Sequence, residues 1–279
     1  MTNQTDETGG LPPGVANLQG SGNVAGRGSF LRSITALVLR EMMTKYGRSP
    51  GGYVWALLEP IGMIVVLSFA FALVLRTPSL GNSFVLFYAS GYLPFTMFMK
   101  LNTGSATSMR KSKSLLSFPA ISWFDAILSN AILTVMTQLL VTYIILMGIL
   151  VLTDVSAHID PVPVVEAMGL AALLGVGVGT TVCALAGLYP LFLQVWKIVT
   201  RPLLLASAVL YILEDMPGIA RDILWWNPVV HITGLARTGV FPTYTGGYIS
   251  VAYVVFVSLV LLAFGLALLG RYHQEILRE

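Results

Sequence analysis

Charged residues are scarce in this 279-residue chain, at 10% of the total against 56% hydrophobic residues. Soluble proteins of ordinary composition carry about 25% charged residues, so the chain lacks the charge that a water-facing surface requires. Its single cysteine, Cys183, lies in an apolar run, which excludes a secreted scaffold built on disulfides. The remaining class is a polytopic membrane protein. For that class, a net charge of +3 does not indicate nucleic-acid binding.

Groups that carry chemistry are also scarce. The sequence contains no P-loop pattern G-x-x-x-x-G-K-[ST], so we expect no ATPase site and no cofactor on this chain. Its histidines, His158, His231 and His273, lie outside the apolar runs without the spacing of metal ligands, so we expect no metal site. The middles of the runs hold almost none of the acids or bases that intramembrane catalysis needs. We therefore expect a transport subunit, not an enzyme.

Long apolar runs are what the sequence does contain. A bilayer core of about 30 Å requires roughly 20 apolar residues in a helix. We predict an all-α protein with six transmembrane helices, at residues 54–75, 82–101, 126–152, 167–189, 195–213 and 248–270. The fifth is the weakest, because its clean stretch, 202–213, is too short to span. It must be extended over Lys197 and Arg201, which would snorkel toward the headgroups.

Lysine and arginine fall mostly on one side of these spans. If the N-terminus is inside, only three of the 16 lie on the far side: Arg76, Arg221 and Arg237. Positive residues concentrate in cytoplasmic loops. The bias therefore predicts that both termini are cytoplasmic, the second as a short C-terminus at residues 274–279.

The region before the first span has two parts. Residues 1–28 are polar and glycine-rich, without the apolar core of a signal peptide, and we expect a flexible cytoplasmic tail. Residues 29–48 predict an amphipathic helix that lies along the cytoplasmic interface. Its apolar stripe consists of Leu31, Ile34, Val38 and Met42. An interfacial anchor without a further role explains this helix equally well. The predicted transmembrane domain follows over residues 49–273.

Two segments between the spans are informative. The short cytoplasmic loop at 109–124 is basic, and we expect one small helix at 112–118 that touches a partner, although the positive-inside bias alone also explains its charge. The far-side segment 214–249 is too apolar for an exposed loop. We predict short amphipathic or re-entrant helices there, broken at Pro217 and Pro228. An interfacial aromatic belt is the alternative for its tryptophan pair.

Three glycines lie close together in the fourth predicted span. Gly175 and Gly179 stand four residues apart, with Gly177 between them. A dinucleotide-binding loop would need a preceding strand in a soluble sheet, which this run lacks. Small residues at this spacing let membrane helices approach closely, so we predict that they serve helix packing.

Several short motifs resemble those of type-2 ABC transporter permeases that export polysaccharides. LRE at 39–41, KYGR at 45–48, GY at 52–53 and WALLEP at 55–60 resemble the approach to the family's first membrane helix. WNP at 226–228, with His231, Arg237 and Phe241, is similar to the periplasmic segment of the capsule-exporting branch. The resemblance covers roughly residues 30–273. The glycine-rich tail is not part of it.

The resemblance implies a bacterial inner-membrane homodimer that works with two copies of a separate subunit, which binds ATP and Mg²⁺. It also implies a periplasmic adaptor, an outer-membrane channel and a lipid-linked acidic polysaccharide as the cargo. The basic loop then matches the family's element for coupling to the ATPase, formed by Arg110, Lys111, Lys113, Leu115 and Phe118. The helix at 29–48 matches its interface helix.

Candidate substrate contacts follow from this interpretation. At the cytoplasmic entrance we expect Arg40, Lys45, Tyr46, Arg48 and Glu59. At the periplasmic exit we expect Trp225, Trp226, His231 and Arg237. For His231 and Arg237, a hydrogen-bonded loop contact is equally compatible with the sequence. An exporter of O-antigen, teichoic acid or a small hydrophobic compound is the nearest alternative function, and a membrane-embedded transferase or a purely structural subunit is more remote.

Overall fold

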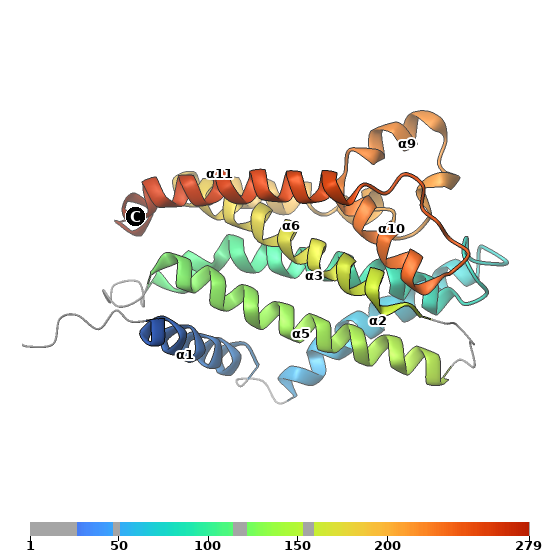
Figure 1. The fold of residues 1–279 in the computed structure, drawn as a ribbon, viewed down its shortest axis with the longest axis horizontal. Helices are drawn as coiled ribbons and strands as arrows, with labels where there is room; N and C mark the ends of the chain where they lie inside the picture. The colour runs from blue at the N-terminus through green and yellow to red at the C-terminus, as the bar shows by residue number, and fades with distance from the viewer. Residues whose placement is uncertain (1–26, 47–50, 114–121, 153–158, 279) are drawn as a thin grey trace, which may run out of the picture.

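The computed structural model describes residues 27–46, 51–113, 122–152 and 159–278. Within these ranges every regular element is a helix, which confirms the all-α prediction (Figure 1). In chain order the elements are α1 (Arg27–Tyr46), α2 (Gly52–Ala72), α3 (Phe84–Lys111), α5 (Trp123–Leu152), α6 (Pro161–Leu188), α7 (Pro190–Val199), α8 (Leu203–Ala206), the 3-10 helix η1 (Leu213–Asp215), α9 (Gly218–Trp225), α10 (Pro228–Val240) and α11 (Val251–Arg278).

Five of the described helices are long and apolar enough to cross a membrane: α2, α3, α5, α6 and α11. They correspond to five of the six predicted spans. The main difference is in α3, which continues past the predicted end at residue 101 as far as Lys111. Arg110 and Lys111 therefore belong to this helix and not to the predicted loop. Leu115 and Phe118, with most of the small helix predicted at 112–118, lie outside the described residues.

The fifth predicted span, 195–213, is not a single helix. The structure has the short helices α7 and α8 here, followed by irregular backbone up to η1. Proline has no N–H to donate to the carbonyl four residues earlier, which interrupts the helix at Pro202. Ala208 then adopts a left-handed conformation, with φ of 52°. The count of six membrane-spanning helices is therefore not met by the described residues.

This broken segment nevertheless runs alongside α3. The Trp196 indole Nε1 donates to Asn102 Oδ1 at 3.3 Å. Further along, a Cβ placed on Gly91 would lie 3.3 Å from the backbone oxygen of Val209. Asn102 and Gly91 are separated by about 16 Å of helix at 1.5 Å per residue. The chain thus returns from the end of α6 toward α9 and α10, and α11 ends near the same end of the molecule as α1 (Figure 1).

The glycines of α6 lie where neighbouring backbones come closest. An added Cβ would lie 2.9 Å from the Phe98 carbonyl oxygen at Gly175 and 2.7 Å from the Asn102 carbonyl oxygen at Gly179, both on α3. At Gly177 it would lie 2.7 Å from the Ser258 carbonyl oxygen on α11. The predicted packing role of these glycines is confirmed. It makes α6 the helix that holds α3 and α11 together.

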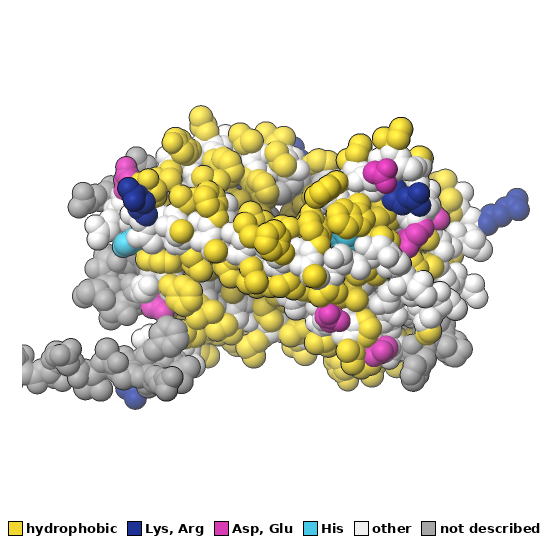
Figure 2. Space-filling model, turned by 45° about the horizontal axis from the view of Figure 1, so that its top comes forward, with side chains coloured by type: hydrophobic (Ala, Val, Ile, Leu, Met, Phe, Trp, Pro, Cys, Tyr) yellow, Lys and Arg dark blue, Asp and Glu magenta, His cyan; other side chains and the backbone are white. Residues whose placement is uncertain are grey.

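The outer surface is broadly apolar. Figure 2 shows a wide hydrophobic area between charged side chains that gather toward the two ends of the visible face. Large apolar side chains are exposed on several long helices, among them Phe69 on α2, Met136 on α5, and Phe256 and Phe264 on α11. A soluble monomer rarely exposes patches of this size. The distribution is that of a protein surrounded by lipid.

Helix α1 is present where the sequence predicts an interface helix. Its buried apolar residues are Ile34 and Leu37, whereas Met42 from the predicted stripe is exposed. The helix packs on α5, and Asn130 Nδ2 donates to Glu41 Oε1 at 3.2 Å. Contact with α5 therefore sets which side of α1 is buried.

Candidate functional site

A cavity of about 870 Å³ lies between α1, α2, α3 and α5. Its walls combine cations with aromatic and small polar side chains. The charged lining residues are Lys45, Glu59, Lys100 and Lys111, and the aromatic ones are Trp55, Tyr92 and Phe95. We call this space the lysine-lined cavity. Its lining residues come from these four helices and from no single segment of the chain.

One face of α3 forms the long wall of this cavity. The lining residues of α3 run from Tyr92 to Lys111, which is about 28 Å of helix. The hydrocarbon core of a bilayer is about 30 Å thick. The part of α3 that lines the cavity is therefore almost as long as the hydrocarbon core is thick.

Lys100 is an ionisable side chain inside a membrane-length helix. Its Nζ lies 3.0 Å from Glu59 Oε2 on α2 and donates to Gln138 Oε1 on α5 at 3.4 Å. The Glu59 side chain is 61% exposed, whereas that of Lys100 is 25% exposed. Charges at membrane depth are expensive and mark functional pathways. Among the residues that line the cavity, the Lys100–Glu59 pair is therefore the clearest indication of a functional pathway.

Lys45 lies at the α1 side of the cavity. Burial lowers the pKa of its ammonium group, and the positive charges of Lys111 and Lys100 lower it further. The carboxylates of Glu41 and Glu59 act in the opposite direction. The positive charges of Lys100 and Lys111 thus both act on Lys45, and cations outnumber carboxylates among the residues that line the cavity.

The predicted entrance residues divide into two groups. The structure brings Lys45 and Glu59 into the lysine-lined cavity, but it places Arg40 on a different surface, beside Leu39 and Met43. The side chain of Tyr46 and the whole of Arg48 lie outside the described residues. Lys100 is not among the predicted entrance residues, because the second predicted span ends at residue 101. The spacing of eleven residues between Lys100 and Lys111, close to three helical turns, is the signal that could have found it.

At the opposite end, the predicted exit residues lie at the end of α9 and on α10. Pro217 precedes α9 and Pro228 begins α10, so both predicted breaks are confirmed. A groove of about 570 Å³ is lined by Glu214, Arg221, Asp222, Trp225, Trp226, Gly247 and Tyr248. The predicted Trp225 and Trp226 thus line this groove. Whether these helices dip into the membrane stays a prediction.

His231 is buried and fully hydrogen-bonded. Its Nδ1 accepts from the Ser250 N–H at 3.1 Å, and its Nε2 is 2.8 Å from the Trp225 carbonyl oxygen. An acceptor at Nδ1 requires the proton of neutral imidazole on Nε2. Burial lowers the pKa of His231, although its backbone hydrogen bonds raise it. The ring fastens α9 to the start of α11.

We expect acid to destabilise the protein through His231. The unfolded side chain has a pKa of about 6.5, so below that value the unfolded state binds more protons than the folded state. Stability therefore falls as the pH drops from about 6.5 toward the lower folded-state pKa. Thermal unfolding in detergent between pH 7.5 and 5.5 should show a fall of several degrees in wild type. His231→Gln should begin lower and fall less.

His273→Gln provides the control, because this histidine lies at the other end of α11 and bonds only within its own helix in the described contacts. It should keep the wild-type dependence on pH. An unchanged acid response in His231→Gln would show that a different group titrates.

Arg237 is fully buried, and its guanidinium group forms hydrogen bonds with backbone carbonyls of the irregular segment before η1. Nη1 donates to the carbonyl oxygens of Ala208 at 2.8 Å and Tyr211 at 2.7 Å, and Nη2 donates to that of Val209 at 2.8 Å. The Phe87 ring lies 4.4 Å from the guanidinium carbon. Burial lowers its pKa to about 10, so it stays charged at neutral pH. The structure shows the hydrogen-bonded loop contact that the sequence left open, and contact of Arg237 with substrate stays a prediction.

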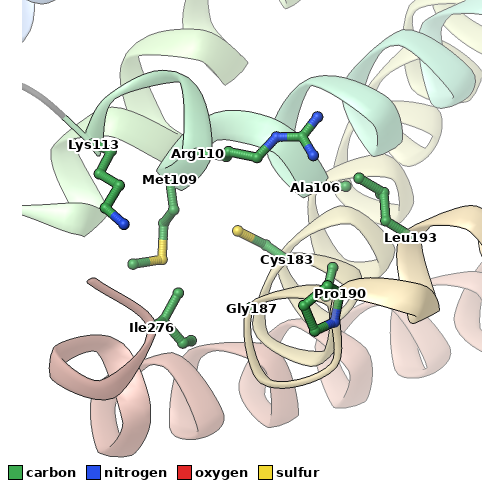
Figure 3. A pocket seen from close by; sticks show the side chains of 10 residues that line it. Ala106, Met109, Arg110, Lys113, Cys183, Gly187, Pro190, Leu193 and Ile276 are labelled. Atoms are coloured by element: carbon green, nitrogen blue, oxygen red, sulfur yellow. The ribbon is translucent and has the colours of Figure 1, made fainter. Parts of the chain in front are cut away.

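A third cavity, of about 330 Å³, lies where α3, α6, α7 and α11 end or begin. Figure 3 shows Arg110 and Lys113 on its α3 side, Cys183 and Gly187 on α6, and Ile276 opposite. Arg110, Lys111 and Lys113 are all exposed. The predicted coupling cations thus lie at the same end of the molecule as the end of α11. Lys111 faces the lysine-lined cavity instead of this one.

The described residues contain no group of three or more His, Cys, Asp and Glu side chains that could hold a metal ion. The cavities described above are lined by ammonium, guanidinium, carboxylate and aromatic groups, together with the Cys183 thiol. Such groups bind and orient anions and flat apolar surfaces.

The chain is similar to known transport proteins over most of its length. A family model described as ABC-2 type transporter matches residues 32–241. The chain is 30% identical over 237 residues to the polysialic acid transport protein KpsM of Escherichia coli, covering 85% of this chain and 92% of that protein. It is 28% identical over 246 residues to the capsule polysaccharide export inner-membrane protein BexB of Haemophilus influenzae (88% and 92%). It is 27% identical over 247 residues to CtrC of Neisseria meningitidis serogroup B, a protein of the same description (88% and 92%).

Proposed function

Because the chain belongs to the ABC-2 type transporter family, we propose that it is the permease of an exporter for lipid-linked, acidic capsular polysaccharide. The relatives are named as capsule polysaccharide export inner-membrane proteins or as a polysialic acid transport protein. The cargo moves from the cytoplasm to the periplasm of a bacterium across the inner membrane. Both termini of the permease face the cytoplasm.

The lysine-lined cavity is the observation that carries this proposal. Its α3 wall extends over about 28 Å, and its aromatic side chains offer flat faces against which sugar rings can pack. Its lysines compensate negative charge on the polymer. A long polymer also needs a path without tight sites that would trap it, and a cavity that mixes cations, aromatics and small polar groups meets that need.

The passage is completed by a second copy of the chain. Glu59 is mostly exposed on α2, although this helix is long and apolar enough to span the membrane. Contact of that carboxylate with lipid would be costly. A second permease facing the cavity removes this cost and leaves a polar space between two protomers.

ATP hydrolysis on a separate subunit drives the transport. This chain lacks a P-loop, and its proposed contact with the ATPase subunit lies at the end of the molecule where Arg110 and Lys113 are exposed. Two ATP-binding subunits engage that end in the homodimer. A periplasmic adaptor and an outer-membrane channel continue the route on the far side.

Reconstitution tests the function directly. The permease is purified with its co-encoded ATPase, and ATP hydrolysis is measured with and without lipid-linked polysaccharide. We expect the polysaccharide to stimulate hydrolysis several-fold, whereas O-antigen linked to its own lipid carrier should not. Equal stimulation by both would overturn the capsule assignment, and none by either would overturn the export function.

Charge reversal at the α3 end is expected to uncouple the two subunits. Arg110→Glu combined with Lys113→Glu places two negative charges where the ATPase contact is proposed. Export should fall at least tenfold, and less ATPase should co-purify with the permease, while the melting temperature of the permease stays near wild type because both side chains are exposed. Lys197→Glu, an exposed cation on α7, serves as the control. Unchanged co-purification of the ATPase would count against this contact.

A further inference from the structure

The groove beside α9 has walls of mixed charge. Its volume is about 570 Å³, and the side chains that give it its chemistry are Glu214, Arg221, Asp222, Trp225, Trp226 and Tyr248. We call it the α9 groove. Two carboxylates would repel an acidic polymer, and the guanidinium group of Arg221 would repel a basic peptide. A ligand that carries one charge of each sign is complementary to both kinds of group.

The two tryptophans of the α9 groove form a corner. The rings of Trp225 and Trp226 are nearly perpendicular, with centroids 5.4 Å apart and an interplanar angle of 89°. Aromatic ring faces attract organic cations. Asp222 and Glu214 line the same groove, and carboxylates accept strong, charge-assisted hydrogen bonds from an ammonium group. Indole rings beside carboxylates are therefore suited to an organic ammonium ion.

The walls of the groove are held in place by neighbouring side chains. The Trp225 indole Nε1 donates to the Tyr248 carbonyl oxygen at 3.2 Å, and the ring stacks on that of Tyr253 with centroids 5.2 Å apart. Glu214 Oε2 accepts from the Tyr244 hydroxyl at 3.1 Å. These contacts position an indole ring and a carboxylate before a ligand arrives, which reduces the entropy lost on binding.

Arg221 and Asp222 are available to a ligand. Both side chains are exposed on α9, and neither forms an ion pair with another residue that the structure describes. Consecutive residues of a helix do not face each other. A guanidinium group binds phosphate through two parallel N–H bonds. The groove thus combines a cation suited to a phosphate with a carboxylate suited to an ammonium group.

An exposed apolar stripe on α9 adjoins the groove. Its members are Ile219, Ile223 and Trp226, which are 80%, 68% and 69% exposed. Spacings of four and three residues place them on one side of the helix, and Trp226 also lines the groove. Figure 1 shows α9 standing out from the bundle beside α10. At a membrane surface, a stripe of this kind contacts acyl chains.

We propose that the α9 groove binds the headgroup of a zwitterionic aminophospholipid, with its phosphate on Arg221 and its ammonium group on Asp222 and the tryptophan corner. The acyl chains lie over the apolar stripe. This lipid belongs to the surrounding membrane and not to the cargo, so the site does not depend on the export function. Its binding holds α9 at the membrane surface.

Photolabelling reports on this site alone. The intact complex of the permease with its ATPase, in detergent, is irradiated with phosphatidylethanolamine that carries a diazirine in one acyl chain. Mass spectrometry should find the label on the peptide that contains Ile219 and Ile223. Unlabelled dioctanoyl-phosphatidylethanolamine should suppress this label at a concentration about fivefold lower than dioctanoyl-phosphatidylglycerol, which lacks the ammonium group. Absence of the label, or equal suppression by the two lipids, would overturn the proposal.

Two substitutions should affect these lipids differently. Asp222→Asn removes the partner of the ammonium group and should abolish the preference for phosphatidylethanolamine, with little change for phosphatidylglycerol. Arg221→Gln removes the partner of the phosphate and should weaken suppression by both about tenfold. Asp215→Asn, an exposed acid in η1 outside the groove, should behave as wild type does. Equal weakening of both lipids by Asp222→Asn would overturn the ammonium contact. If a variant does not fold, the preference of the wild type decides.

Two soluble probes distinguish a lipid from a protein partner. Glycerophosphoethanolamine has the headgroup without the chains and should suppress the label only at concentrations about a hundredfold higher, because the apolar contact is lost. N-acetyl-lysine amide carries an ammonium group without phosphate. If it suppressed the label as strongly as the phospholipid, a basic segment of a partner protein would be the ligand and the lipid assignment would be wrong. Stimulation of ATP hydrolysis by lipid-linked polysaccharide is measured separately, so a failure here leaves the export function standing.

Discussion

Replacing Arg237 with methionine is expected to abolish the accumulation of folded protein. The substitution keeps an unbranched side chain but removes every donor. The carbonyl oxygens of Ala208, Val209 and Tyr211 then lose the guanidinium hydrogen bonds that they accept in the interior. A buried polar group without its partner costs about 1–3 kcal/mol, and loss of the contact with the Phe87 ring adds about 0.5–2 kcal/mol.

The expected loss of folding free energy is therefore at least about 3 to 4 kcal/mol, a large part of a domain's whole stability of about 5–15 kcal/mol. We expect size exclusion in detergent to show little monodisperse protein. Arg237→Lys should recover part of the yield, because one ammonium group can still bond to some of these carbonyls. Arg221→Met is the matched control, since Arg221 is exposed on α9. If Arg237→Met folded normally and lost only export, Arg237 would act on the substrate, as the sequence also allowed.

Substituting valine for Gly179 is expected to separate α3 from α6. A Cβ at this position would lie 2.7 Å from the Asn102 carbonyl oxygen and 2.7 Å from the Ser105 Cβ. Neither atom is the free end of a flexible side chain, so a whole helix has to move. Overpacking of a close interior costs about 1–3 kcal/mol and occasionally more. We expect the melting temperature to fall by about 5 °C or more.

Gly169 in the same helix provides the control. A Cβ there meets no atom within 4 Å, so Gly169→Val should leave the melting temperature near wild type. Both variants make the same chemical change in α6, and only the distance to α3 differs. Equal melting temperatures for the two would contradict the backbone-to-backbone packing of α3 and α6.

The sequence predicted the membrane class, five of the long helices and the packing glycines, because hydropathy and small-residue spacing are local signals. It failed at residues 195–213, where the apolar stretch had to be extended over Lys197 and Arg201 to reach a spanning length, and where Pro202 and the left-handed Ala208 interrupt the helix. The irregular backbone there depends on donors from Arg237 on α10. A contact between residues so far apart in sequence produces no pattern in the local sequence from which it could be predicted.

The candidate site was predictable only in part. Lys45 and Glu59 were found through motifs near the first membrane helix, and both line the cavity. Lys100 was missed because a polar residue near the end of an apolar run resembles a span boundary. Its place inside α3 becomes clear only once the helix is seen to continue to Lys111. Gln138 and Asn130 were not predicted as site residues for a related reason. Both are buried amides on α5, and only their contacts with other helices show where they belong.

The glycine contacts of α6 also have a mechanical consequence. Where backbones touch, with Gly175 and Gly179 against α3 and Gly177 against α11, two helices can hardly slide past each other without a steric clash. Helix α2, by contrast, buries only one narrow stripe, formed by Ala56, Pro60, Ile64, Leu67 and Ser68. Close backbone contacts therefore hinder relative movement of α3, α6 and α11, whereas α2 meets its neighbours through the side chains of one stripe. We expect a force on the permease to shift α2 before it shifts α6.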